Sequence, residues 1–219
     1  MGTGRHSHAA VALDGHLYVL GGEHEDNNLF GEEPETLASV ERYDPVTDTW
    51  EAVAPMGTAR THHVAVAMNG AIIAATGYDG DHYLRSCERY DPATDAWAPA
   101  MPDLATARGS AAASVGPDGR LYISGGHNTE FVLASVEAFH PVNNTWWVST
   151  MTTTHEDHAL VVLDGTLYAF GGYVQVEGRH SRRLVESFDP QSYEWTRVPE
   201  MEPRGWKMVG SSAVAVREI

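Results

Sequence analysis

Histidines are the residues of this chain that most suggest metal chemistry, because imidazole is the commonest metal ligand in proteins. The chain has 12 of them, and several form local pairs: His6 with His8, His62 with His63, and His155 with His158. A metal site also needs a further ligand, such as a carboxylate, in fixed geometry, and the sequence contains no His-Glu-x-x-His motif. We therefore predict no metal and no cofactor, and we interpret the histidines as pocket or rim residues.

Cys87 is the single cysteine of the chain and therefore its one candidate thiol nucleophile. A reactive thiolate needs cations that lower its pKa, and Arg85 is the only basic residue close to it in sequence. Cys87 lies next to Glu88 in an apolar segment, so we expect a small core residue. The chain also lacks a glycine-rich phosphate loop and a Gly-x-Ser-x-Gly motif. These patterns favour a protein that is not an enzyme.

The charge of the chain limits its partners. It has 30 acidic and 14 basic side chains, a net charge of −16, which repels phosphate backbones and anionic lipid. We predict a protein or peptide partner, basic or neutral in charge, and neither nucleic acid nor membrane; the alternative is that the acidity only maintains solubility. The single cysteine cannot form an internal disulfide, and the first residues do not resemble a signal peptide, so we expect a cytoplasmic location.

A repeat of 47 to 49 residues organises the sequence. It is marked by Trp50, Trp97, Trp146 and Trp195. Each tryptophan closes a related segment: "SVERYDPVTDTW", "SCERYDPATDAW", "SVEAFHPVNNTW" and "LVESFDPQSYEW". One glutamate position is shared by all four repeats: Glu41, Glu88, Glu137 and Glu186. A period of this length indicates a repeat architecture.

Each repeat predicts four short antiparallel strands. In each of the four repeats, two apolar runs are joined by Asp-Gly or Asn-Gly, as in "AAVALDGHLYVLGG", which is typical of a tight hairpin. The repeated segment that ends at each tryptophan supplies a third strand, and the residues after each tryptophan supply a fourth. Such a sheet cannot bury both faces alone, whereas radial stacking buries them against one another. We therefore predict an all-β propeller.

The chain resembles the kelch repeat, especially that of BTB-kelch proteins, over nearly its whole length. The resemblance rests on the double glycine, the Glu-x-Tyr/Phe-x-Pro segment, the tryptophan and the segment "APMGTAR". We call this last segment, which precedes the first apolar run of a repeat, the lead-in segment. Three positions depart from the pattern: Thr76 replaces a first glycine, His140 an aspartate and His155 a lead-in arginine. The resemblance implies blades at approximately 5–56, 57–101, 102–151 and 152–201, with 202–219 as the first strand of a further blade.

Kelch propellers usually close with about six blades, so the resemblance also implies that this chain is part of a larger ring. It implies that the C-terminal strand returns to complete the first blade and that the N-terminus is truncated. A small or partner-completed assembly is the alternative, because an incomplete ring leaves blade edges exposed.

By the same resemblance, ligands meet the loops after the double glycines and after the lead-in residues. There the side chains differ between repeats, as contact residues should. The predicted contact residues are His6, Ser7, Glu23, His24, Thr61, His62, Tyr78, Asp79, Ser110, His127, Asn128, Asp157, Tyr173 and Trp206. Tyr78, Tyr173 and Trp206 are the candidate anchors, since aromatic side chains often dominate binding.

Two longer insertions follow a double glycine: an acidic one between Gly22 and Ser39, and an arginine-containing one between Gly172 and Leu184. They form either a polarised ligand face or merely solvated loops.

The sequence thus predicts a protein-interaction module, and the resemblance implies the substrate-recognition part of a cullin ubiquitin ligase adaptor, reached through upstream modules. A kelch-type enzyme or sugar-binding propeller is one alternative, and a structural or cytoskeletal scaffold is another.

Overall fold

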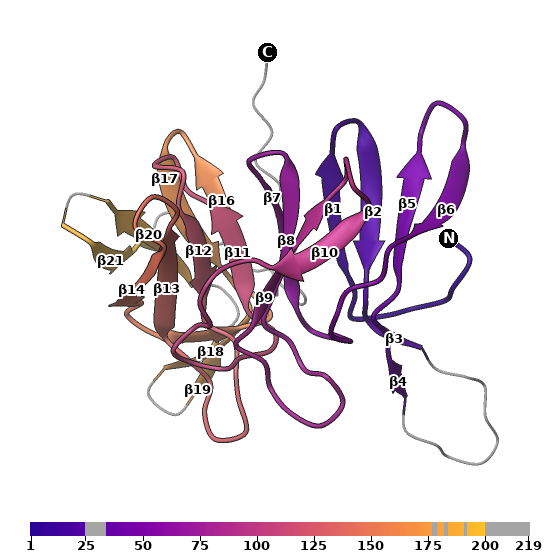
Figure 1. Cartoon of the computed structure of the whole chain (residues 1–219). Helices are drawn as coiled ribbons and strands as arrows, with labels where there is room; N and C mark the ends of the chain where they lie inside the picture. The colour runs from indigo at the N-terminus through magenta and orange to yellow at the C-terminus, as the bar shows by residue number, and fades with distance from the viewer. Residues whose placement is uncertain (25–33, 177–178, 182–183, 191, 200–219) are drawn as a thin grey trace. The chain divides into compact units, whose positions relative to one another are not determined.

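The structure is a computed structural model that describes residues 1–24, 34–176, 179–181, 184–190 and 192–199 (Figure 1). The chain divides into two compact units, Met1–Gly109 and Ser110–Ile219. Each unit contains two four-stranded antiparallel sheets, here called blades 1 to 4 in chain order. The predicted all-β class is therefore confirmed. Among the described residues no helix is long and apolar enough to span a membrane.

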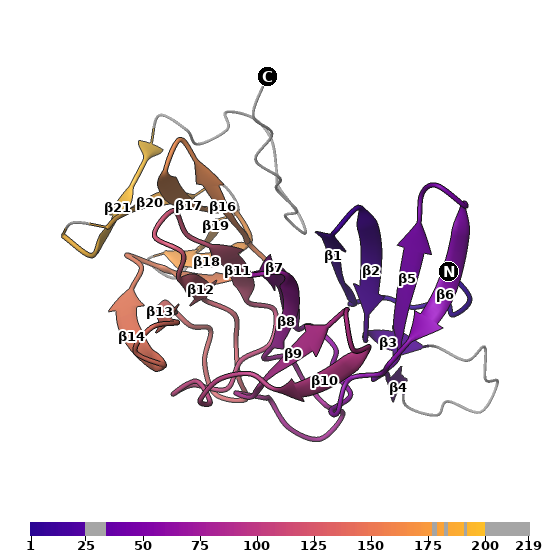
Figure 2. The ribbon, with the colours of Figure 1, turned by 45° about the horizontal axis from the view of Figure 1, so that its top comes forward.

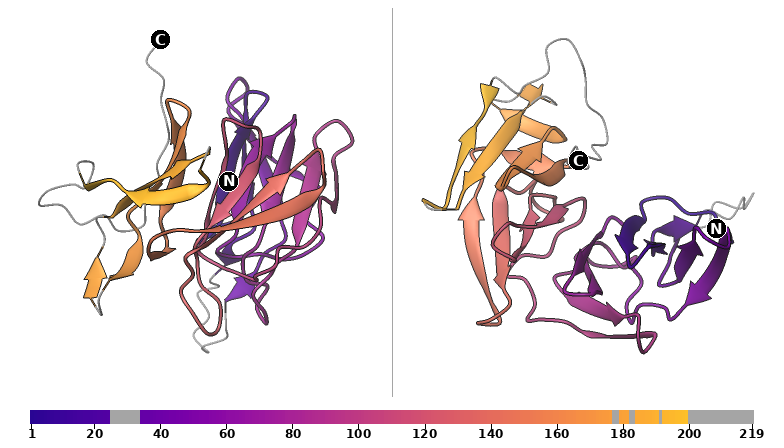
Figure 3. Two further views of the ribbon diagram at one scale, coloured as in Figure 1. Left: turned by 90° about the vertical axis from the view of Figure 1, so that its left-hand side faces the viewer. Right: turned by 90° about the horizontal axis from the view of Figure 1, so that it is seen from above.

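The first unit holds blades 1 and 2. The strands of blade 1 are β1 (Ala9–Leu13), β2 (His16–Leu20), β5 (Val40–Asp44) and β6 (Thr49–Val53), in that order. A short hairpin, β3 (Glu23–His24) with β4 (Glu35–Thr36), extends between β2 and β5. The strands of blade 2 are β7 (Val64–Met68), β8 (Ala71–Ala75), β9 (Cys87–Asp91) and β10 (Ala96–Pro99). The four strands of blade 1 lie side by side in Figure 2 and, in indigo to purple, in the right-hand view of Figure 3.

The second unit repeats this plan. The strands of blade 3 are β11 (Ala112–Val115), β12 (Leu121–Ser124), β13 (Ser135–His140) and β14 (Thr145–Thr150). Those of blade 4 are β16 (Ala159–Leu163), β17 (Thr166–Phe170), β20 (Val185–Asp189) and β21 (Glu194–Arg197). A further sheet joins β15 (Thr154–Glu156), β18 (Tyr173–Val176) and β19 (Arg179–Ser181).

The predicted opening hairpins are confirmed at their turns. Asp14 and Gly15 have φ of 50° and 77°, and Asn69 and Gly70 have 51° and 71°. Positive φ at both central residues is the requirement of a type I′ turn, whose twist matches that of the flanking strands. These dipeptides therefore set the register of β1 on β2 and of β7 on β8.

The repeated tryptophans lie inside the fourth strands, which begin one residue before each tryptophan rather than after it as the sequence predicts. The reason is a cross-strand aromatic pair: Tyr43 opposes Trp50 with ring centroids 5.1 Å apart, and Tyr90 opposes Trp97 at 5.2 Å. Blades 3 and 4 repeat it with Phe139–Trp146 and Phe188–Trp195. Such pairs stabilise antiparallel strands, so the tryptophan extends the pairing by one residue.

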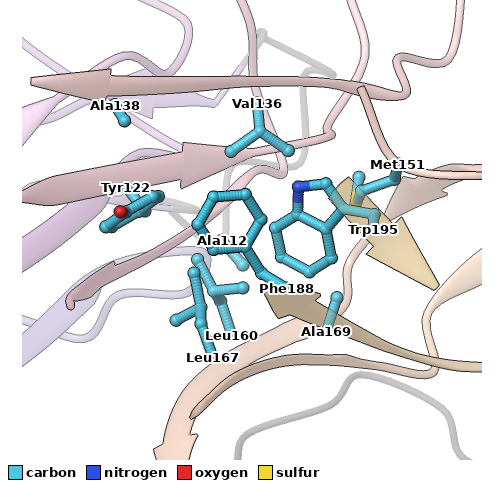
Figure 4. Close-up of a cluster of buried hydrophobic side chains, with 10 residues drawn as sticks. All are labelled: Ala112, Tyr122, Val136, Ala138, Met151, Leu160, Leu167, Ala169, Phe188 and Trp195. Carbon is cyan, nitrogen blue, oxygen red and sulfur yellow. The ribbon is translucent and has the colours of Figure 1, made fainter. Parts of the chain in front are cut away.

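Each unit has its core between its two blades. In the second unit β11 lies against β16, and Figure 4 shows Phe188 and Trp195 of blade 4 facing Tyr122 and Val136 of blade 3. In the first unit Tyr18, Leu20 and Val40 of blade 1 pack on Ile72, Ala74 and Tyr90 of blade 2. The blades bury apolar faces on one another, as the repeat predicts.

Several predictions fall outside the described residues. They concern the C-terminal strand at 202–219, the anchor Trp206, most of the acidic insertion and part of the arginine-containing one. Ring size and blade boundaries also stay predictions.

Candidate functional site

Three of the shared glutamates, Glu41, Glu88 and Glu186, bind the lead-in segment of their own blade. Glu88 accepts hydrogen bonds from the backbone N–H groups of Gly57 and Thr58, at 2.6 and 3.1 Å, and from Arg60 Nη2 at 3.0 Å. The side chain of Arg60 is fully buried, as is that of Arg5, which pairs with Glu41 at 2.8 Å. Burial alone would raise the pKa of Glu41, but hydrogen bonds from Gly2, Arg5 and Thr3 hold it below its usual value. These ion pairs fix each lead-in segment on its blade and are unavailable to a ligand.

The double glycines allow backbone segments to approach closely. A Cβ on Gly21 would lie 2.3 Å from the carbonyl oxygen of Arg60 and 2.9 Å from Cε1 of His63. A Cβ on Gly22 would lie 2.4 Å from the carbonyl oxygen of His6. Both glycines have positive φ, of 55° and 90°. No side chain fits at either place, because real Cβ atoms do not come this close to backbone oxygen.

The histidine three residues after a lead-in arginine or histidine is a packing residue in two of the blades. His63 and His158 are buried, and their rings lie against Gly21 and Gly125 respectively. Burial lowers the pKa of His63 to about 3, with Arg60 contributing further, so this ring is neutral in the folded protein. In the described part of the chain, no three His, Cys, Asp or Glu side chains gather closely enough to hold a metal ion.

The segments after the lead-in and after the double glycine pair with each other through their backbones. His6 exchanges two hydrogen bonds with Glu23, at 3.0 and 2.9 Å, and Thr61 does the same with Tyr78 at 2.9 Å. In blade 4, Glu156 pairs with Tyr173. Predicted contact residues far apart in sequence are therefore neighbours within a blade.

The second residue after each lead-in has left-handed backbone. Ser7, His62, Ser110 and Asp157 all have φ of 51° or 52°. Within each unit these segments are also linked across blades, since His62 N–H donates to Ser7 O and Asp157 N–H donates to Ser110 O, both at 3.0 Å. A repeated strained conformation of this kind persists only where the surrounding structure enforces it.

In the first unit, the predicted contact residues differ in exposure. The side chains of His6 and His62 are exposed, Tyr78 is half-buried, and Thr61 is fully buried. Tyr78 packs on Tyr83, with ring centroids 5.2 Å apart, and the two residues also pair through their backbones. The sequence reasoning missed Tyr83; its signal was the loop "YDGDHY", in which two tyrosines flank turn residues.

His24 and Ser7 lie beside this group. His24 Nδ1 donates to the carbonyl oxygen of Gly4 at 2.7 Å, and both His24 and Ser7 are partly exposed. Figure 1 shows the β3–β4 hairpin and the segment joining β8 to β9 extending from the same end of blades 1 and 2. A Cβ on Gly80, in the segment joining β8 to β9, would lie 3.5 Å from Oγ1 of Thr36 in β4. The hairpin and this segment are therefore within contact distance of each other.

Two of the predicted contact residues act within their own loops. Asp79 Oδ1 accepts from the N–H groups of Asp81 and His82 at 2.9 and 2.7 Å, and Asn128 Oδ1 accepts from those of Glu130 and Phe131 at 2.9 and 3.0 Å. Burial alone would raise the pKa of Asp79, but the N–H donors outweigh it and lower the pKa. Both side chains therefore shape the loop after the double glycine.

In the second unit, His127 and Glu156 form a cross-blade pair, with Nδ1 2.9 Å from Oε2 and both side chains partly exposed. Asp157 is exposed and Tyr173 half-buried, whereas Ser110 is buried. Cys87 is buried in β9, as the sequence predicts. The described surface of these loops offers hydrogen-bonding, acidic and aromatic groups, which suit recognition of another molecule.

Comparisons with known proteins agree with the repeat pattern. The family model described as the KLHDC2/KLHL20/DRC7 Kelch-repeats domain matches residues 2–157, and the Kelch motif model matches residues 156–202. Kelch-like protein 23 of Homo sapiens is 30% identical over 206 residues, covering 91% of this chain and 34% of that protein. Kelch-like protein 25 of Mus musculus is 33% identical over 202 residues, covering 89% and 33%.

The chain thus spans about one third of the length of these curated relatives. A solved structure, "Structure of YjhT", superposes with a TM-score of 0.74 at 14% identity, covering 90% of this chain and 71% of that one, which shows the shared fold. Because the first family model alone matches well over half of the residues, this chain belongs to the kelch-repeat family and is similar to the kelch-like proteins.

Proposed function

We propose that this chain is a protein-binding module that contacts its partner through the loops after the lead-in segments and the double glycines. One observation carries the proposal: the same backbone pairing recurs in three blades and presents different side chains in each. The pairs are His6 with Glu23, Thr61 with Tyr78, and Glu156 with Tyr173. Constant backbone with variable side chains is the arrangement expected of a recognition surface on a rigid scaffold.

The rigidity of these loops supports the proposal energetically. The buried lead-in arginines and the inter-blade hydrogen bonds from His62 to Ser7 and from Asp157 to Ser110 hold the loops before any partner arrives. A preorganised surface loses little conformational entropy on binding, so more of the contact energy appears as affinity. This favours binding of a protein or an extended peptide over catalysis.

The net charge of −16 supports a partner segment that is basic or neutral. More specifically, we propose that the chain recognises substrates for a cullin ubiquitin ligase. The similarity to kelch-like proteins 23 and 25 supports this role, which would require modules outside the present sequence. A cytoplasmic location, suggested by the lone cysteine, is part of the same proposal.

A paired substitution tests the binding face. Tyr78→Ala with Tyr173→Ala removes, from each unit, one half-buried tyrosine that follows a glycine. The matched control is Val46→Ala with Val142→Ala; these side chains are 90% and 85% exposed in the turns at the other end of β5 and β13. With the whole chain as bait, we expect a captured protein to be retained by the control and by wild type, but not by the tyrosine variant.

Thermal unfolding of the same variants distinguishes binding from stability. If the tyrosine variant unfolds at a clearly lower temperature, the tyrosines are structural and the assignment of the face is wrong. Equal capture by all three proteins would also contradict it. The ligase role has its own test: a pull-down of the full-length gene product that recovers no cullin or ubiquitin component would reject that role while leaving the binding function intact.

A further inference from the structure

The loop of blade 2 between β8 and β9 is closed by its own hydrogen bonds. Tyr78 and Tyr83 pair through their backbones, and their rings pack on each other. Asp79 N–H donates to His82 O at 3.1 Å, while Asp79 Oδ1 accepts the N–H groups of Asp81 and His82. An aspartate that caps a turn in this way uses its acceptor oxygen inside the loop. The tip of the loop, residues 80–82, is exposed.

The loop of blade 3 between β12 and β13 is closed by the same set of bonds. His127 pairs with Val132 by an isolated bridge. Asn128 N–H donates to Phe131 O at 3.0 Å, and Asn128 Oδ1 accepts the N–H groups of Glu130 and Phe131. Asparagine can replace aspartate here because only an acceptor oxygen is needed, and both side chains have one. Residues 129–131 form an exposed tip.

The tips carry side chains that take no part in closing the loops. Asp81 and Glu130 occupy the same position in the two loops, and both are exposed. Among the described residues, neither carboxylate has an ion-pair or hydrogen-bond partner. A ring follows each carboxylate: His82 in blade 2 and Phe131 in blade 3. Sequence comparison could not find these positions, because it does not show which loop residues are used inside the loop.

Phe131 stands out among the phenylalanines that the structure describes. Its side chain is 66% exposed, whereas those of Phe139 and Phe188 are 6% and 3% exposed. A single exposed apolar residue is common on protein surfaces. The backbone of Phe131, however, is held by Asn128 on both its N–H and its carbonyl side. A partner that covers this ring therefore gains a large apolar contact and orders little backbone of the loop.

A carboxylate next to an aromatic ring suits the side chain of arginine. The guanidinium group stacks on aromatic faces, and its fork of N–H groups pairs with a carboxylate. The net charge of −16 attracts a basic segment and repels an acidic one. Glu130 and Phe131 together thus offer the contacts that an arginine needs, and Asp81 offers a second carboxylate.

We propose that the tips of these two loops bind basic side chains of the partner, with an arginine on Glu130 and Phe131 and a further basic side chain on Asp81. Asp79 and Asn128 then act by holding the tips in place. This inference deepens the proposed function and rests on it: it assigns the chemistry of the partner segment and the residues that select it.

Peptide selection on the whole chain tests the proposal without a known partner. A phage-displayed library of random peptides is selected on the immobilised chain, and a recovered peptide is measured by fluorescence anisotropy. We expect the recovered peptides to be enriched in arginine. Glu130→Gln with Phe131→Ala should weaken binding of such a peptide by about tenfold, the combined effect of an exposed ion pair and a cation–π contact.

The matched control is Asp164→Asn with Val142→Ala in the same unit. It also removes one negative charge and one exposed apolar side chain, from turns at the other end of β17 and β13. Asparagine suits this turn, because Asn69 has the same place and a φ of 51° in blade 2. We expect this control to bind the peptide as wild type does. Thermal unfolding of both variants should match wild type, since all four side chains are exposed.

A charge exchange separates direct contact from general attraction. Glu130→Arg should weaken binding of the arginine peptide, and replacing that arginine of the peptide by glutamate should restore binding to Glu130→Arg alone. Peptides rich in aspartate or glutamate, or equal affinity of wild type and Glu130→Gln with Phe131→Ala, would overturn the proposal. If Tyr78→Ala with Tyr173→Ala still abolished binding in that case, the proposed function would stand and only the tips would be wrong.

Discussion

Thr76 is a β-branched residue in a place where the other blades have glycine, and its replacement by glycine should stabilise the protein. Its φ is 64°, against 55° for Gly21 in blade 1. The two positions make the same bonds: Thr76 N–H donates to Ser86 O at 3.1 Å and Gly21 N–H to Ser39 O at 3.0 Å, while each carbonyl accepts from its lead-in arginine. Thr76 is fully buried, and its Oγ1 has no hydrogen-bond partner among the described residues.

The size of the effect follows from four terms. Left-handed backbone costs a residue with a Cβ about 1–2 kcal/mol. A buried hydroxyl without a partner costs about 1–3 kcal/mol. Against these, glycine gains about 0.5–1 kcal/mol of freedom in the unfolded chain relative to alanine. The buried methyl group contributes about 1 kcal/mol that the variant loses. The free energy of unfolding of Thr76→Gly should therefore exceed that of wild type by about 2 kcal/mol.

Urea denaturation followed by tryptophan fluorescence measures this difference. Thr76→Ala is the first control, since it removes the hydroxyl but keeps the strained backbone, and its stability should lie below that of Thr76→Gly. The opposite exchange, Gly21→Ala, is the second: its Cβ would lie 2.3 Å from Arg60 O, so we expect a large loss of stability. If Thr76→Gly unfolds at a lower urea concentration than wild type, the reasoning from backbone strain is wrong.

Three further substitutions test the roles of side chains that are partly or fully buried. Trp97→Ala should cost about 3 kcal/mol in thermal or urea unfolding, because the ring packs on Tyr90 and its N–H donates to Ala54 O at 2.9 Å; a loss below 1 kcal/mol would contradict this. His63 has a folded-state pKa of about 3, below its ordinary value, so its stabilisation is complete above about pH 6.5 and is lost as the pH falls toward 3. When the pH is lowered from 7 to 4.5, the free energy of unfolding of His63→Leu should therefore fall by about 2–3 kcal/mol less than that of wild type. Parallel pH profiles of the two proteins would contradict this role of His63. Glu88→Gln leaves the buried Arg60 without its counter-charge and should cost about 3 kcal/mol, whereas exposed Val46→Ala should be neutral.

The contact face illustrates what sequence reasoning can and cannot reach. Comparing the repeats separated the variable positions from the constant ones, and the structure brings His6 to Glu23 and Thr61 to Tyr78 through their backbones. The comparison of the repeats could not separate exposed from buried positions. Thr61 is fully buried whereas its neighbour His62 is exposed, because the left-handed turn at His62 directs consecutive side chains differently. The partnership of Tyr78 with Tyr83 depends on the path of a loop, which no repeat specifies.

The sequence by itself determined the repeat, the all-β architecture and the kelch family, because each blade solves the same packing problem with the same residues. The tertiary structure alone decided what those residues do. Glu41, Glu88 and Glu186 bind lead-in segments 28 to 39 positions away, as between Arg60 and Glu88 and between Gly2 and Glu41. The structure also showed that His155 takes the place of arginine in blade 4, with its ring nitrogens 3.0 Å from Gly171 O and from Glu186 Oε1. Hydrogen-bond partners of this kind are set by the distance between atoms in space, and spacing along the chain does not reveal them.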